Sequence, residues 1–401
     1  MFLTSNIKNS QTLFYTSKYR NFHLIMLYFD HSATTPIDPK VADLMHEVAE
    51  KHFGNPSSIH KYGQKARAII EKSRRQIADA LIVKSRNIIF TGGGSEANNM
   101  VLQNLLYSDK KHVITSSIEH PAIVKVLKHL KKFGVSFTTV AVDKYGLVDP
   151  INIASAIQDD TALISIMYAN NEVGTIQPIS EVAKIAHKKN ILFHSDAVQA
   201  PGKIPIITNE LNPDLMSFSA HKFYGPKGVG FLYLRDGIKL HPMIIGGGQE
   251  KKMRAGTENT PGIAGLGLAM ELAIQNLPNT QNHLETLENH FKTQLLKIYP
   301  IAVFNGHPEF HLPGLISVTI PSITSDILLV NLDMKGMAVS SGSACSSGAV
   351  KPSDVLKAMH MSNQNNISTL RISFGKGNTI EEVNMLIDTL AEIINKYSRK
   401  R

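Results

Sequence analysis

The feature of the sequence that most constrains its fold is an alternation of short β-branched runs with helical patterns between about residues 60 and 235. In the segment 96–106, for example, Ala97, Met100, Val101 and Leu105 fall on one helical face. Strands that alternate with helices are typical of a mostly parallel sheet covered by helices, so the sequence predicts an α/β domain with a seven-stranded sheet. The predicted strands are 87–90, 112–115, 135–142, 162–168, 191–195, 215–219 and 229–234, and the predicted helices are 64–81, 96–106, 121–133 and 180–189.

The pattern changes beyond about residue 265, where helices become longer and strands fewer. Here the sequence predicts two long helices, 284–298 and 380–395, and two strands between them, 315–320 and 370–374. We therefore predict a large domain over residues 41–265 and a smaller α+β domain over residues 266–401, which the N-terminal segment 27–40 joins.

Residues 1–26 form an extension that we exclude from either domain. The first 29 residues contain basic, Ser, Thr and Asn residues but no Asp or Glu, as in a weak organelle-targeting segment. The alternative is that Met26 is the true first residue, because recognisable structure begins at Leu27, and we favour it. The expected location is then the cytoplasm, or an organelle if the extension is a transit peptide.

Composition excludes several classes of protein. No apolar run approaches the roughly 18–20 residues of a membrane span. A single cysteine excludes an internal disulfide and any multi-cysteine metal site within one chain, and it fits a reducing compartment. The net charge of +9 is scattered and lacks interleaved aromatic residues, which favours a basic surface for an anionic cofactor and acidic partners over nucleic acid.

One lysine directly follows a strand that is predicted to be buried. Lys222 comes after the strand 215–219 and precedes a tight loop at 223–228. A lysine desolvated in this way has a lowered pKa and can form a Schiff base with an aldehyde. If it stood alone, Lys222 would more simply be a strand-end lysine facing water.

Two polar residues follow another predicted strand, 191–195. At this edge of a sheet, the carboxylate of Asp196 is suited to pair with a protonated ring nitrogen. Gln199 lies on the same face if a helical turn follows. In isolation, Asp196 has a second interpretation as a helix cap.

A glycine-rich turn and a histidine occupy two further strand-to-helix junctions. The turn that contains Gly94 and Ser95 offers backbone amides, a helix N-terminus and a hydroxyl to an anion, although it matches neither the P-loop nor the dinucleotide fingerprint. His120 is placed to stack on a flat ring and to move protons, but a lone loop histidine is more often structural.

Together these segments resemble the class V aminotransferase branch of the fold-type I pyridoxal-phosphate enzymes. Residues 339–348 are similar to the active-site loop of the group I cysteine desulfurases, the NifS/IscS family. The resemblance extends from about residue 27 to the C-terminus, and it is also carried by residues 28–36, 53–58, 169–174 and 254–257.

Two features depart from the family pattern. The turn at 92–95 has three glycines where relatives often carry Ser and Ala or Thr. The chain also ends soon after Tyr397, so the longer tail with which some relatives dock a scaffold protein is not expected here.

The resemblance implies a role for each matching residue around a pyridoxal 5'-phosphate cofactor. Lys222 would bind the cofactor covalently, Asp196 would pair with its pyridine nitrogen, and Gln199 would bond its phenolic oxygen. His120 would stack on the ring as a candidate acid and base. The residues implied to hold the phosphate are Gly94, Ser95, Ser219 and His221, with Thr257 of the partner subunit of a homodimer.

The family also implies where the substrate binds. Asn171, which borders the cofactor as well, and Arg371 would bind the substrate carboxylate, for which the planar guanidinium is suited. Lys222 would take the α-proton of L-cysteine. Cys345 would attack the substrate sulfur, leaving L-alanine and a persulfide on Cys345.

Cys345 lies among small Gly, Ser and Ala residues at 342–348. This neighbourhood predicts a loop that can move between a substrate and an acceptor, and it argues against an inert buried thiol. The resemblance implies that the sulfur is supplied to an iron-sulfur cluster scaffold or to a tRNA-thiolation carrier. The chain itself would bind no metal, and Cys345 would at most transiently ligate a cluster shared with the scaffold.

Other functions remain compatible with parts of this pattern. A transaminase or a selenocysteine lyase would use the same fold and cofactor. A non-catalytic sulfur-relay or nucleic-acid-binding protein would account for the basic charge. The loop around Cys345 favours desulfuration over transamination, and the complete set of cofactor-site residues argues against a non-catalytic protein.

Overall fold

The computed structural model describes residues 26–341 and 351–398. Cys345 and the extension up to residue 25 therefore lie outside the described residues.

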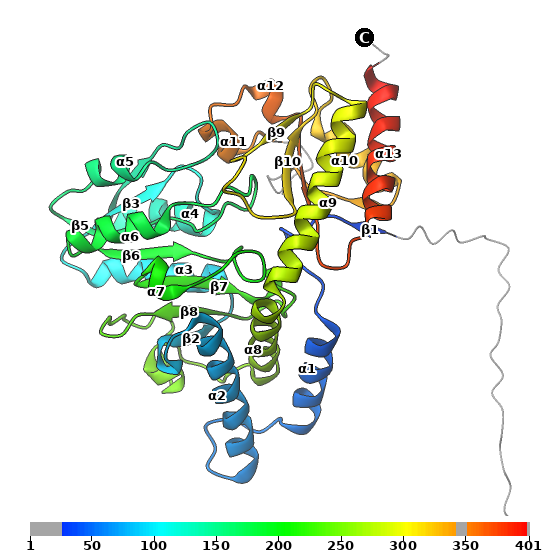
Figure 1. Ribbon diagram of the computed structural model, residues 1–401. Coiled ribbons are helices and arrows are strands. Elements are labelled where there is room, and N and C mark those ends of the chain that lie inside the picture. The colour runs from blue at the N-terminus through cyan, green and yellow to red at the C-terminus, as the bar shows by residue number, and fades with distance from the viewer. Residues whose placement is uncertain (1–25, 342–350, 399–401) are drawn as a thin grey trace, which may run out of the picture.

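Seven strands form one sheet in the order β2-β8-β7-β6-β5-β3-β4 (Figure 1). Only β8 runs antiparallel to its neighbours, β2 and β7, and the other pairs are parallel. The mostly parallel seven-stranded sheet that the sequence predicts is thus confirmed. The strands are β2 (Ile88–Thr91), β3 (His112–Ser116), β4 (Ser136–Val140), β5 (Thr161–Ser165), β6 (Leu192–Asp196), β7 (Leu215–Ser219) and β8 (Gly230–Leu234).

Helices pack on both faces of this sheet, which explains why its strands read as continuous apolar runs. Successive residues of a strand point to opposite faces, and in β7 Leu215 belongs to one hydrophobic cluster and Met216 to another. The first cluster includes α3 (Gly94–Gln103) and α4 (Pro121–Leu130). The second includes residues of α1 (Pro39–Lys51), α2 (Lys61–Leu81), α5 (Pro150–Ser155), α6 (Ile179–Lys188) and α8 (Thr260–Gln275).

Two predicted helices end earlier than their apolar pattern suggests. The α-helical part of the segment 96–106 stops at Gln103, and a 3-10 turn continues over Asn104–Tyr107. The segment 121–133 likewise changes to a 3-10 turn at Lys131–Phe133, before Gly134 at positive φ. Tightening of the last turn satisfies carbonyls that have no partner further along the helix, and the apolar spacing barely changes there.

The C-terminal part of the chain builds a third hydrophobic cluster around a three-stranded antiparallel sheet, β12-β10-β9. The N-terminal β1 (Leu27–Tyr28) reaches this region and pairs with β11 (Met337–Ala338). The other elements are α9 (Leu277–Ile298), β9 (Val303–Asn305), β10 (Leu315–Thr319), α10 (Ser325–Met334), α11 (Asp354–Ala358), α12 (Asn363–Asn366), β12 (Thr369–Ser373) and α13 (Ile380–Ser398), and a short α7 (Thr208–Leu211) follows β6.

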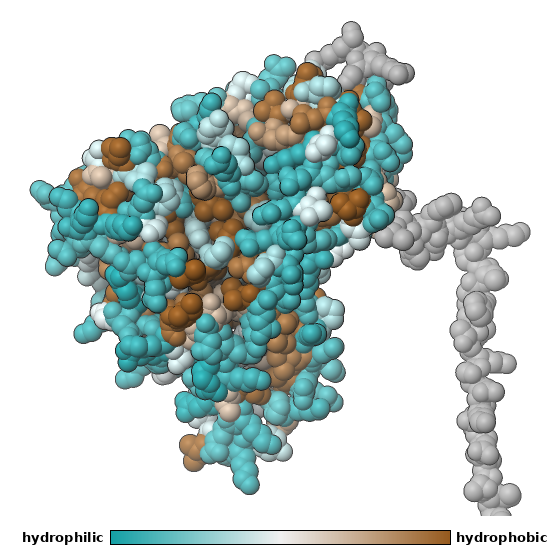
Figure 2. Space-filling view, viewed as in Figure 1, coloured by the Kyte–Doolittle hydropathy of each residue, from teal (hydrophilic) through white to brown (hydrophobic). Residues whose placement is uncertain are grey.

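Hydrophilic residues cover most of the face seen in Figure 2, and hydrophobic residues gather near its centre. Half-buried apolar residues of α8, such as Leu268 and Leu272, pack against the hydrophobic cluster that contains Met216. Within residues 26–341 and 351–398, no helix is long and apolar enough to cross a membrane.

Candidate functional site

The functional residues gather at one edge of the large sheet. The parallel strands β2, β3, β6 and β7 end there at Thr91, Ser116, Asp196 and Ser219. In open α/β sheets the carboxyl ends of the strands are where ligands bind. Lys222 reaches this edge from the 3-10 turn Ala220–Lys222 that follows β7.

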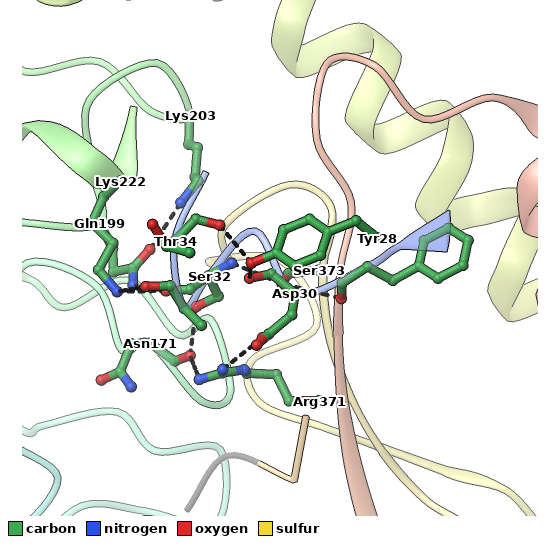
Figure 3. A network of polar contacts seen from close by, with 12 residues as sticks. Tyr28, Asp30, Ser32, Thr34, Asn171, Gln199, Lys203, Lys222, Arg371 and Ser373 are labelled. Atoms are coloured by element: carbon green, nitrogen blue, oxygen red, sulfur yellow. Dashed lines mark hydrogen bonds and ion pairs between the residues drawn. The ribbon is translucent and has the colours of Figure 1, made fainter. Parts of the chain in front are cut away.

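The amine of Lys222 is held by backbone carbonyls of the N-terminal segment. Nζ donates to the carbonyl oxygens of Ser32 and Ala33, each at 2.7 Å (Figure 3). Burial is the largest cause that lowers the pKa of Lys222 to about 8, and the positive charge of Arg371 lowers it further, against the opposing effect of Asp196 and Asp30. An amine poised near neutrality is suited to nucleophilic attack and to proton transfer.

Asp196 presents a buried carboxylate at the end of β6. Only 7% of its surface is exposed. Nδ2 of Asn98 donates to Oδ2 at 2.6 Å, and the backbone N–H of Val198 donates to Oδ1 at 3.1 Å. Two neutral donors fix the carboxylate, and no cation among the described residues forms a hydrogen bond with it, so it is suited to a cationic ring nitrogen.

Gln199, three residues beyond Asp196, contacts the segment that holds Lys222. Its Nε2 donates to the carbonyl of Ser32 at 2.9 Å, the same oxygen that accepts from Lys222. Figure 3 shows the two side chains meeting at this segment. The N-terminal residues therefore link the lysine and the glutamine.

The glycine-rich turn has the geometry of an anion site. Gly93, the N-cap of α3, has φ 148°, a conformation that side chains disfavour, and it offers no side-chain cap to the first-turn amides. A Cβ on Gly94 would lie 2.6 Å from Cγ2 of Val198, so the backbone must stay bare there. Ser219 lies across the turn, since its Oγ would be 3.6 Å from a Cβ on Gly93, and exposed Ser95 follows in the helix. These amides and hydroxyls fit a phosphate.

Two histidines flank the lysine. Nδ1 of His120 accepts a hydrogen bond from the backbone N–H of Ala122 at 3.1 Å, which leaves Nε2 to carry the proton in the neutral ring. Burial lowers the pKa of His120, and Asp196 opposes this effect. His221 contacts Oγ1 of Thr34 at 3.1 Å, and burial with nearby Lys222 lowers its pKa to about 4. Both rings are thus favoured in the neutral form at neutral pH.

Arg371 enters the site from β12. Nη2 donates to Oδ1 of Asp30 at 2.8 Å, and Nη1 donates to the backbone oxygen of Asn171 at 3.1 Å. Its Nε is buried and has no hydrogen-bond partner among the described residues. A buried donor without a partner is costly, so this N–H is a candidate to bind an anionic group of a substrate.

The structure does not bring every predicted residue into this cluster. Thr257 is exposed and lies in a loop. Three residues earlier in this loop, Nε of Arg254 forms an ion pair with Oε1 of Glu96 in α3 at 2.9 Å. The assignment of Thr257 to the site of a partner subunit stays a prediction. Cys345 lies outside the described residues, and its role stays a prediction as well.

Several residues that contribute to the site are not among the predicted site residues. They are Asp30, Ser32, Asn98, Glu119 and Lys203. Asp30 meets Arg371 across 341 residues of sequence, a separation that no local pattern reports. For Lys203 a signal existed, because it follows Gln199 by four residues in the same loop.

Glu119, the neighbour of His120, is a buried acid behind the site. Its Oε1 accepts from Oγ of Ser116 at 2.6 Å and from the backbone N–H of Met167 at 2.9 Å, while Oε2 has no partner among the described residues. Burial is the main cause that raises its pKa from 4.5 to about 8. Glu119 is therefore protonated at neutral pH.

Replacing Glu119 with glutamine is expected to stabilise the fold. The folded state resists ionisation of Glu119, so the free energy of unfolding falls as pH rises from about 4.5 to about 8 and is level above that. Glu119→Gln removes this loss, a gain of about 2–4 kcal/mol near pH 8 and almost none below about pH 4.5. Urea unfolding at several pH values measures it.

The exposed Glu50 of α1 provides the matched control, because Glu50→Gln removes the same charge from water. It should change the free energy of unfolding little at any pH. A Glu119→Gln protein that follows the wild-type pH dependence would show that Glu119 is ionised in the folded chain.

The residues of the cluster fit one kind of cofactor. The amides of the turn at Gly94 suit a phosphate, Asp196 suits a protonated ring nitrogen, and the amine of Lys222 suits an aldehyde. Pyridoxal phosphate combines these three groups.

Known proteins match the chain over most of its length. The family model for aminotransferase class-V matches residues 27–386. A cysteine desulfurase IscS from Dictyoglomus turgidum is 44% identical over 373 residues, which cover 92% of this chain and 95% of that protein.

Solved structures agree with this match. A NifS-like protein from Rickettsia africae superposes with a TM-score of 0.84 at 34% identity and covers 92% of this chain and 99% of its own. SspA in complex with cysteine superposes with a TM-score of 0.77 at 34% identity, with 88% and 100% covered. The chain therefore belongs to the class-V aminotransferase family and, within it, to the cysteine desulfurases of the IscS and NifS-like kind.

Proposed function

We propose that the chain uses pyridoxal 5'-phosphate to convert L-cysteine to L-alanine and transfers the sulfur to Cys345 as a persulfide. The observation that carries the proposal is the amine of Lys222, whose pKa is lowered to about 8 beside Asp196 and Arg371. Its relatives named cysteine desulfurase and a neighbour solved with cysteine bound support the choice of substrate.

Pyridoxal phosphate, when bound, supplies an aldehyde for amines and a conjugated ring that takes up the electron pair released at the substrate Cα. The amides at Gly94 and the hydroxyls of Ser95 and Ser219 would hold its phosphate, together with His221 and the partner subunit's Thr257. Asp196 and Gln199 would orient its ring. Lys222 would hold the cofactor covalently through its amine, which is the group that also acts on the substrate.

The remaining residues act on the substrate. Arg371 and Asn171 bind its carboxylate, and the neutral amine of Lys222 removes the proton from Cα. The thiolate of Cys345 then forms an S–S bond with the substrate sulfur while the substrate C–S bond breaks. The electron pair of that bond stays on the carbon skeleton, which takes up protons to become L-alanine, with His120 as a candidate donor.

Incubation of the purified protein with L-cysteine and pyridoxal phosphate tests this proposal. Alanine should appear, sulfide should be released with a reductant, and mass spectrometry should find an added sulfur on Cys345. The variant Cys345→Ser should lose the persulfide and the sulfide while it still binds the cofactor. Because a neutral hydroxyl cannot replace the thiolate, we expect at least about a hundredfold loss of rate.

Each rival function has its own signature in the same assay. A keto acid in place of alanine would identify a transaminase, and turnover of selenocysteine without turnover of cysteine would identify a selenocysteine lyase. Wild-type rates of alanine and sulfide formation in Cys345→Ser would contradict the proposed sulfur step.

The persulfide would supply an iron-sulfur cluster scaffold or a tRNA-thiolation carrier in the cytoplasm. We further propose that the chain acts as a homodimer. Exposed apolar side chains between α1 and α2, Phe53 and Ile59, are 72% and 91% exposed and support a surface that a second copy covers. Light scattering would test the dimer, and Phe53→Ser with Ile59→Ser should weaken it.

A further inference from the structure

A second lysine lies in the site and has no role in the mechanism described above. Lys203 belongs to the turn that follows Gln199, where its backbone N–H donates to the carbonyl of Ala200 at 3.0 Å. Its Nζ donates to Oε1 of Gln199 at 2.8 Å. Figure 3 shows the side chain entering the network beside Gln199 and Lys222.

The contact decides which way the amide of Gln199 faces. A side-chain amide has a donor and an acceptor at similar positions, so only its neighbours select the orientation. The ammonium group of Lys203 only donates and takes Oε1, while the carbonyl of Ser32 only accepts and takes Nε2. Both neighbours therefore turn the N–H groups of Gln199 toward the segment that holds Lys222.

The charge of Lys203 is otherwise unfavourable at this place. Its ammonium group bonds a neutral amide, and no carboxylate among the described residues offsets its charge. Burial first, and then the positive charges of Lys222 and Arg371, lower the pKa of Lys203 to about 7. Lys203 in turn lowers the pKa of His31 and His221. A cation in such surroundings does not stabilise the fold by itself, which favours a role in the site.

We propose that Lys203 is a positioning residue, whose hydrogen bond to Gln199 keeps the amide N–H groups of Gln199 directed at the Ser32 carbonyl and the cofactor beside Lys222. The inference rests on the proposed function for the identity of the cofactor. Lys203 performs this task whether it is charged or neutral, because an N–H donor is present in either state.

The pH dependence of the visible absorbance of bound pyridoxal phosphate tests the proposal without turnover. In Lys203→Met only the Ser32 carbonyl still orients the amide of Gln199, so the cofactor is left with a less well directed donor for its less protonated form. The midpoint of the titration should rise by about 0.5–1 unit, a three- to tenfold change in proton affinity. Lys203→Arg keeps the donor and should stay within about 0.2 units of the wild type.

A matched control removes the same charge elsewhere. Lys189 is exposed at the end of α6, and Lys189→Met should leave the titration midpoint unchanged. If Lys203→Met fails to fold, Lys203→Gln replaces it. The shorter amide does not reach the same position, so the titration midpoint should rise as expected for Lys203→Met.

A double-mutant cycle separates positioning from general damage to the structure. If Lys203 acts through Gln199, adding Lys203→Met to Gln199→Ala should shift the midpoint no further than Gln199→Ala alone. Equal shifts in both backgrounds, or no shift in either, would overturn the proposal. A shifted midpoint in a protein that makes no alanine would support the role of Lys203 and reject the desulfurase reaction, so the two failures are distinguishable.

Discussion

Replacing Lys222 with alanine is expected to lower the rate of alanine formation by at least about a thousandfold, because the amine acts as both nucleophile and base. Its pKa, lowered from 10.5 to about 8, raises the neutral fraction of this amine near neutral pH by roughly 300-fold over an exposed lysine. No other described amine shares its contacts with the Ser32 and Ala33 carbonyls. Steady-state and single-turnover assays with L-cysteine measure the loss.

The variant Lys222→Arg separates the chemistry from the packing. A guanidinium can still donate to the carbonyls of Ser32 and Ala33, but it remains protonated and forms no Schiff base. We therefore expect the melting temperature of Lys222→Arg to stay close to that of the wild type while turnover is lost. Turnover within about tenfold of the wild type in either variant would show that Lys222 is not the catalytic amine.

Much of the large sheet could be predicted because its signal is local. Strands buried on both faces must be apolar throughout, and each is bounded by a helix with its own period. Helix α8 was not predicted from the sequence, because its surroundings are apolar on nearly every side and it therefore lacks a clear polar face. A Cβ on Gly265 would lie 2.7 Å from Sδ of Met45, and one on Gly267 would lie 2.7 Å from Cα of Ser73. Glycines that permit such close packing have a low helix propensity, so the sequence pattern does not indicate a helix here.

The site divides in a similar way. Asp196, Gln199 and Lys222 could be placed together because each lies at or just beyond the carboxyl end of a strand at the same edge of the sheet. The Asp30–Arg371 ion pair could not, because the two residues are far apart in sequence and meet only when β12 packs beside the N-terminal segment. The family resemblance named Arg371 and left its partner unidentified.

Replacing Arg371 with lysine is expected to raise the KM for L-cysteine by about 10- to 100-fold and to change kcat less. Lysine keeps a positive charge for Asp30, whose Oδ1 accepts from Nη2 at 2.8 Å, but it lacks the planar fork and the Nε–H. In the wild type this buried Nε–H has no partner among the described residues, so a substrate carboxylate would satisfy it. The loss should therefore appear mainly in binding.

Cysteamine, which is L-cysteine without its carboxylate, tests whether Arg371 binds that carboxylate. If Arg371 binds the carboxylate, Arg371→Lys should weaken the binding of L-cysteine while the dissociation constant of cysteamine stays within about twofold. Arg86→Lys, at an exposed ion pair with Asp236, controls for the loss of a guanidinium and should alter neither ligand. Equal weakening of both ligands in Arg371→Lys would mean that Arg371 supports the site only through Asp30 and the backbone of Asn171.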